Sequence, residues 1–168
     1  MGHRAIAASI ATFAAALAVA GWCAGTAEAA ATCTWGGMPA DPTGTFEFLG
    51  QGLTHTPSRG SLPFTATGPL AGGCSGTFTF RGQFDAGSTC EFGTFEGSAI
   101  GLPGVVRFAG AAPVGIAPAR LYDAHGDVVG SENAQVDTLA NAPHFIDCNT
   151  AQGFKGGNFS SVIELFGG

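Results

Sequence analysis

The sequence predicts an all-β protein, built as a single antiparallel β-barrel or β-sandwich domain. Apolar and polar residues alternate in several short segments, which is typical of half-buried strands. Clusters of Gly, Pro, Asp and Ser separate these segments and favour tight turns. No segment after residue 30 has apolar residues at helical spacing. Short strands with frequent turns favour a sandwich or a barrel. Gly within the strands favours the curvature of a small barrel, but the residues leave this choice open.

Two Phe-rich segments define the first expected strands. In residues 45–49, Phe46 and Phe48 are expected to point inward. Residues 77–84 form a longer strand of the same kind, with its polar side chains facing outward. Its inward positions are Phe78, Phe80, Gly82 and Phe84. The glycine among them leaves one gap on the inner face.

Three more elements are expected toward the C-terminus. Residues 105–109 form a short strand with Val106 and Phe108 inward. Residues 121–129 form a tight hairpin around an Asp- and Gly-containing turn. Residues 159–166 alternate as a last strand. Its inward side chains are expected to be Phe159, Ser161, Ile163 and Leu165.

The segment from residue 90 to residue 99 departs from simple alternation. Phe92 and Phe95 lie three positions apart, so a regular strand would place them on opposite faces. Because Gly93 lies between them, we expect a β-bulge that turns both rings inward.

Residues 1–29 are predicted to be a signal peptide that is cleaved after Ala29. Arg4 provides a short positive region, residues 5–22 are apolar and Ala-rich, and Ala-Glu-Ala at the end provides small side chains for signal peptidase. An uncleaved membrane anchor is the alternative, which the weak hydrophobicity of Ala disfavours. We therefore expect a secreted, extracellular protein whose single β domain comprises residues 30–168.

The cysteine count agrees with export. Cleavage removes Cys23 and leaves Cys33, Cys74, Cys90 and Cys148. An even number in an exported protein predicts two disulfides. We favour Cys74–Cys90 with Cys33–Cys148, since the first two flank the Phe-rich strand and its turn. The alternative is Cys33–Cys74 with Cys90–Cys148, and spacing alone does not decide between them.

Several short motifs follow one another along the chain. A Cys just inside the mature chain is followed by Gly-Thr-Phe-x-Phe at 44–48, Gly-Leu-Thr at 52–54, Cys-Ser-Gly-Thr-Phe-Thr-Phe at 74–80 and Gly-Asn-Phe-Ser-Ser-Val at 157–162. This layout resembles the small exported four-cysteine β-proteins of actinobacteria, which are generally uncharacterised. The resemblance implies a secreted all-β domain and supplies no activity.

Composition and motifs exclude several classes of function. A net charge of -6 with scattered Arg argues against nucleic-acid binding. The sequence has no Gly-x-Ser-x-Gly motif, and oxidised cysteines are not nucleophiles. His55, His125 and His144 are interpreted as loop residues, since no Ser is paired with them in the sequence. We therefore predict no catalytic residue.

Two groups of side chains are candidate sites. Glu91 and Glu96 would form a glycosidase pair if the Gly93 bulge put them on one face, but solvated outer-face carboxylates are the favoured interpretation. The candidate metal ligands are Asp123, His125, Asp127, His144 and Asp147. They offer too few converging donors, and turn geometry explains the Asp and Gly residues. We predict neither a metal nor a cofactor.

The predicted function is that of a non-catalytic binding or interaction module. Its partner is expected to be a small apolar ligand or an extracellular protein, because a small Phe-rich barrel either fills itself with side chains or holds one ligand. We expect no nucleic-acid partner and no stable membrane insertion. The alternative is a structural protein of the cell surface or extracellular matrix, followed by a small hydrolase.

Overall fold

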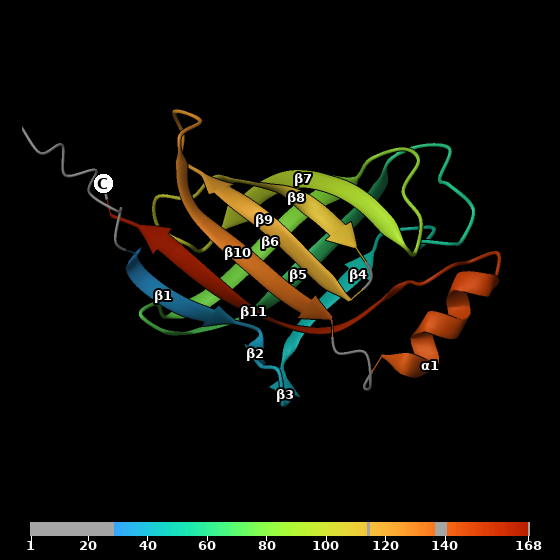
Figure 1. Ribbon diagram of the computed structural model, residues 1–168, viewed down its shortest axis with the longest axis horizontal. Helices are drawn as coiled ribbons and strands as arrows, with labels where there is room; N and C mark the ends of the chain where they lie inside the picture. The colour runs from blue at the N-terminus through green and yellow to red at the C-terminus, as the bar shows by residue number, and fades with distance from the viewer. Residues whose placement is uncertain (1–28, 114, 137–140, 168) are drawn as a thin grey trace, which may run out of the picture.

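The computed structural model describes residues 29–113, 115–136 and 141–167, which form a closed antiparallel β-barrel (Figure 1). Its strands are β1 (Ala29–Trp35), β2 (Gly37–Met38), β3 (Asp41–Pro42), β4 (Gly44–Phe48), β5 (Leu62–Gly72), β6 (Gly76–Phe84), β7 (Phe92–Ile100), β8 (Arg107–Pro113), β9 (Ile116–Tyr122), β10 (Val128–Val136) and β11 (Gly156–Phe166). Helix α1 (Ala142–Phe145) runs into a 3-10 turn (Ile146–Asn149) between β10 and β11. The all-β prediction is confirmed, and the open choice resolves to the barrel.

The ring has eight positions, because β1 and β4 share one of them. Strands β5 to β11 follow one another around the barrel, and both β1 and β4 pair with β5 and β11 to close it. Between β1 and β4 the chain leaves the wall as the β2–β3 hairpin (Figure 1). A Cβ atom on Gly68 of β5 would lie 2.8 Å from Cα of Gly36 and 3.1 Å from Cα of Gly44. Three glycines therefore let the chain leave and rejoin the wall.

The expected alternation is confirmed in the Phe-rich and C-terminal strands. Along β6 the inward rings are buried, with 0% of Phe78 and 1% of Phe80 exposed, and Gly82 occupies the gap. Along β11 the buried inward residues include Phe159, Ser161 and Ile163, and the intervening Ser160 is buried as well. The hairpin over residues 121–129 is also present, as β9, a turn and β10.

The predicted bulge at Gly93 is wrong. Strand β7 pairs with β8 in an unbroken register, so Phe92 points outward with 54% of its surface exposed and Phe95 points inward. Gly93 takes the inward position, where a Cβ atom would lie 2.6 Å from both the Phe84 ring and the Ser88 hydroxyl. The glycine is there because the interior is crowded, and no extra residue is inserted.

The inward orientation of Val106 is also wrong. Strand β8 begins at Arg107, one residue after Val106, and Val106 is 47% exposed. Val105 is buried instead, because it closes a turn in which its N–H donates to the carbonyl of Leu102. Strand alternation does not extend into that turn. Phe108 is buried inward as expected.

The disulfides are Cys33–Cys74 and Cys90–Cys148, so the pairing we favoured is wrong and the alternative is observed. Cys33 pairs with Gly72 across β1 and β5, which brings it beside Cys74. The nine residues of β6 separate Cys74 from Cys90. A strand of that length spans roughly 30 Å, so these two cysteines lie at opposite ends of the barrel.

The predicted signal peptide lies outside the described residues, except for Ala29, which begins β1. In the part of the chain that the structure describes, no helix has the length and apolar character needed to cross a bilayer.

Candidate functional site

One half of the barrel interior is packed with aromatic rings. Trp35 lies at its centre, with ring centroids 4.6 Å from Phe78 and 4.5 Å from Phe159. Its indole N–H donates to the carbonyl of Phe78 at 3.0 Å, which satisfies the polar atom of a buried Trp. These residues form the floor of the space that lies beyond them.

The other half contains a cavity of about 110 Å³. Its aromatic wall includes Phe48, Phe64, Phe84, Phe95 and Phe154. The cavity extends to Ile116, which is 44% exposed, and to half-buried Phe145 of α1, so it reaches the surface at this end of the barrel. Helix α1 lies beyond the same end (Figure 1). We call this end the mouth.

Small side chains on one side of the barrel explain why the space stays open. Ala112 of β8, Ala117 of β9 and Ala134 of β10 line the cavity opposite the Phe rings. Folded interiors are normally close-packed. Methyl groups facing rings leave volume that no neighbouring side chain fills.

Glu132 of β10 also lines this cavity, and only 3% of its surface is exposed. The hydroxyl of Ser161 donates a hydrogen bond to its Oε1 atom. Its Oε2 atom has no hydrogen-bond partner among the described residues. A buried polar atom without a partner destabilises the fold, so this carboxyl needs an explanation.

The strand register brings Glu132 and Ser161 together. Ala134 pairs with Ser161 across β10 and β11, and Glu132 lies two residues before Ala134 on the same inward face. Residues in this diagonal arrangement are within reach when one side chain is long. The contact is thus set by the barrel wall itself.

Burial determines the charge of this carboxyl. Loss of hydration disfavours the ionised form and raises the pKa of Glu132 from 4.5 to about 8, although the hydrogen bond from Ser161 acts in the opposite direction. At neutral pH Glu132 is therefore mostly an uncharged carboxylic acid.

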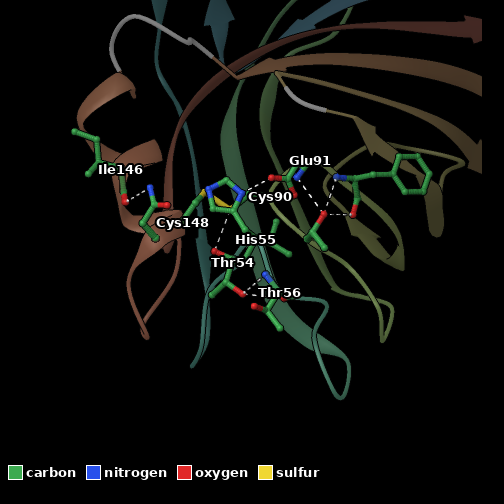
Figure 2. A network of polar contacts seen from close by, with 11 residues as sticks. Thr54, His55, Thr56, Cys90, Glu91, Ile146 and Cys148 are labelled. Atoms are coloured by element: carbon green, nitrogen blue, oxygen red, sulfur yellow. Dashed lines mark hydrogen bonds and ion pairs between the residues drawn. A yellow bond between two sulfur atoms is a disulfide. The ribbon is translucent and has the colours of Figure 1, made fainter.

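The structure does not bring Glu91 and Glu96 together. Glu91 contacts the ring of His55 beside the Cys90–Cys148 disulfide (Figure 2). The hydrogen bond from His55 lowers the pKa of Glu91 below its usual value. Glu96 faces solvent on β7 and lies 3.8 Å from Arg107. The two carboxyls have different neighbours, so they do not form a glycosidase pair.

The remaining histidines also lie apart from the cavity. His125 belongs to the β9–β10 turn, where Oδ1 of Asp123 accepts the backbone N–H groups of His125 and Asp127 at 2.8 and 2.9 Å. This is the backbone role expected of the turn. His144 is exposed on α1. In residues 29–113, 115–136 and 141–167, no three His, Cys, Asp or Glu side chains gather as metal ligands.

Sequence reasoning missed Glu132, because the one available signal, the hairpin, gives the wrong face for it. The predicted β9–β10 hairpin, with regular pairing, would set Val129 opposite the inward Leu121, which would place Glu132 on the outer face. An irregularity between Val128 and Gly130 shifts the register and reverses that count. The inward residues of β10 also include Gly130 and Ala134, so this strand shows little apolar alternation.

Comparisons of the chain with protein-family models, with curated proteins and with solved structures found no match. The geometry of the barrel therefore carries the functional inference. Its interior has an apolar cavity that reaches the surface at the mouth, and the described lining of that cavity includes the buried acid Glu132.

Proposed function

We propose that the protein binds a small, largely apolar molecule inside the barrel. The cavity of about 110 Å³ carries this proposal, because it is lined by Phe and Ala side chains and reaches the surface at the mouth. Pockets of this kind, mostly apolar with few polar groups, are typical of small-molecule sites.

The cavity volume indicates the size of the buried part of the ligand. An apolar cavity of about 150 Å³ lined by Leu, Ile and Phe holds benzene. The cavity here is smaller, about 110 Å³, so a single ring is the upper limit for the enclosed part of the ligand, and the rest of a longer ligand would extend through the mouth. Burial of apolar area supplies about 25 cal/mol per Å² of favourable free energy.

We propose binding without catalysis, and a secreted location. The described part of the cavity lining contains one acid, Glu132, while His55 and Glu91 lie outside it. Hydrolysis normally needs a nucleophile and a base within hydrogen-bond reach. The disulfides Cys33–Cys74 and Cys90–Cys148 are consistent with an oxidising compartment.

Filling the cavity tests the proposal. Ala134 lines it, so Ala134→Leu places new methyl groups where the ligand lies. Ala71→Leu is the matched control, since Ala71 is exposed on β5. Benzene is titrated into each protein, and binding is followed by the upfield shifts that the Phe rings impose on its NMR signals.

Wild type and Ala71→Leu are expected to bind benzene saturably, and Ala134→Leu at least about tenfold more weakly. Failure of the wild-type protein to bind, or equal binding by the Ala134→Leu protein, would contradict the proposal.

A further inference from the structure

The apolar lining explains why the cavity binds hydrocarbon, but it does not explain Glu132. A Leu at this position would bring no polar atom into the cavity, whereas Glu132 leaves Oε2 with no partner among the described residues. Each unpaired buried polar atom weakens the folded state. A group inside the cavity that pairs with this atom would remove that deficit.

The chemistry of the carboxyl identifies the complementary group. In its uncharged form a carboxylic acid has one O–H donor. The Ser161 hydroxyl donates to Oε1, so that oxygen acts as an acceptor. We infer that the acid proton lies on Oε2, the oxygen that has no partner among the described residues. The surrounding cavity therefore presents one O–H donor.

We propose that the ligand carries a carbonyl oxygen on a hydrocarbon frame, and that Glu132 recognises this oxygen by donating a hydrogen bond from Oε2. This inference rests on the proposed function and names the ligand class of the same cavity: a small ketone, aldehyde or ester. Ser161 is the positioning residue, because its own hydrogen bond holds the carboxyl.

A cationic amine fits the site less well. An ammonium group has three N–H donors, and among the described residues the polar side-chain partners in this part of the barrel are Glu132, Ser161 and, near the mouth, Thr89. A buried ion pair must also overcome the loss of hydration of both charges. A carbonyl needs a single donor and carries no charge.

An ordered water is also a poor match. Buried waters normally make about three hydrogen bonds to protein groups. Most of the described side chains that line the cavity with Glu132 are Phe and Ala, which offer none. A ligand that supplies one acceptor and otherwise hydrocarbon satisfies both parts of the lining.

The test uses three molecules of nearly the same shape: methylcyclopentane, cyclopentanone and cyclopentylamine. Their dissociation constants are measured by NMR titration at about pH 6, below the raised pKa of Glu132. The proteins are wild type, Glu132→Leu and Glu132→Gln. Glu164→Leu and Glu164→Gln are the matched controls, since Glu164 is exposed on β11.

Removing the donor should affect the ketone alone. Glu132→Leu is expected to weaken cyclopentanone binding by about tenfold while methylcyclopentane binds equally well or more tightly. Glu132→Gln should keep cyclopentanone within about threefold of wild type, because its amide N–H donates in place of the acid. The Glu164 variants should match wild type with every ligand.

A spectroscopic signature separates a direct contact from a change in packing. The C=O stretch of bound cyclopentanone should move to lower wavenumber in the wild-type protein and return toward its value in hydrocarbon in Glu132→Leu. A double cycle compares cyclopentanone with methylcyclopentane in both the wild-type and the Glu132→Leu proteins. It isolates the free energy of the contact between the ligand carbonyl and Glu132.

The outcomes distinguish the two proposals. If methylcyclopentane binds and Glu132→Leu leaves cyclopentanone binding unchanged, the carbonyl inference is wrong and the apolar site remains. Tight binding of cyclopentylamine that Glu132→Gln abolishes would show an ion pair and overturn the inference. If no ligand binds, the proposed function itself fails.

Discussion

At the scale of single residues, Glu132 is a carboxyl enclosed by aromatic and methyl groups, with one donor, Ser161, beside it. Such a group is held uncharged by its surroundings. The same burial that suits it for recognising a carbonyl makes the stability of the barrel depend on pH.

The unfolding free energy should fall as pH rises from about 4.5 to about 8. The folded-state pKa of Glu132, about 8, lies above its ordinary value of 4.5, so the native protein holds a proton that the unfolded chain releases in this window. The difference corresponds to roughly 5 kcal/mol over the whole window. Denaturant unfolding at several pH values measures it.

Glu132→Gln provides the control for this pH dependence, because it keeps the shape of the side chain and cannot ionise. Groups whose pKa is lowered, such as Glu91, are already charged above pH 5 and contribute equally to both proteins. The variant should therefore show a flatter profile. Parallel profiles for the two proteins would show that Glu132 ionises normally in the folded state.

A second residue-scale prediction concerns Gly93. Gly93→Ala places a methyl group 2.6 Å from the Phe84 ring, so we expect a loss of about 1–3 kcal/mol in unfolding free energy. Gly60→Ala is the matched control, since a Cβ atom there meets nothing within 4 Å. Urea unfolding compares them, and equal stability of the two variants would contradict the crowding at Gly93.

At the scale of elements, the sequence is most informative where one face of a strand is uniformly large and apolar. Strand β6 places Phe78, Phe80 and Phe84 inward, and its period is visible in the sequence. Strand β10 is recognisable by its hairpin, but its inward Gly130 and Glu132 carry no such period. Half of the cavity wall could be predicted in this way, and the half that bears the acid could not.

Cysteine pairing also depends on contacts between elements. Cys33 meets Cys74 because β1 pairs with the end of β5, a contact between residues far apart in the chain. Only strand order provides this information. Spacing along the sequence favoured Cys74–Cys90, whose residues the length of β6 keeps apart.

The connectivity is tested by digesting the protein without reductant. Mass spectrometry should detect one linked peptide with Cys33 and Cys74 and another with Cys90 and Cys148. Replacing Cys33 and Cys74 by Ser together should lower the unfolding free energy by about 4 kcal/mol, because the bond closes a chain segment of 41 residues. A linked peptide with Cys74 and Cys90 would contradict the fold.

At the scale of the whole molecule, the two halves of the barrel interior differ. At the end opposite the mouth, Leu102 and Val105 of the β7–β8 turn are buried. At the mouth, Ala134 and its neighbours leave space that Ile116 only partly covers. A barrel selected for stability alone would fill this space, since unfilled volume lowers stability by about 24 cal/mol per Å³.

The last prediction couples ligand binding to the stability of the whole barrel. Ala134→Leu fills part of the cavity and should raise the unfolding free energy by about 1 kcal/mol. Benzene should raise the melting temperature of wild type in proportion to its occupancy, since it binds the folded state and not the unfolded chain. It should raise the melting temperature of Ala134→Leu much less, because that protein binds benzene at least about tenfold more weakly.

The Ala71→Leu protein separates this effect from a general response to added apolar surface, because its new side chain lies outside the barrel. Its melting temperature should rise with benzene as that of wild type does. If Ala134→Leu is less stable than wild type and responds to benzene as wild type does, the interior is already filled and the barrel has no ligand site there. Higher stability combined with a much smaller benzene response would mean that the unfilled volume at the mouth is kept for a ligand.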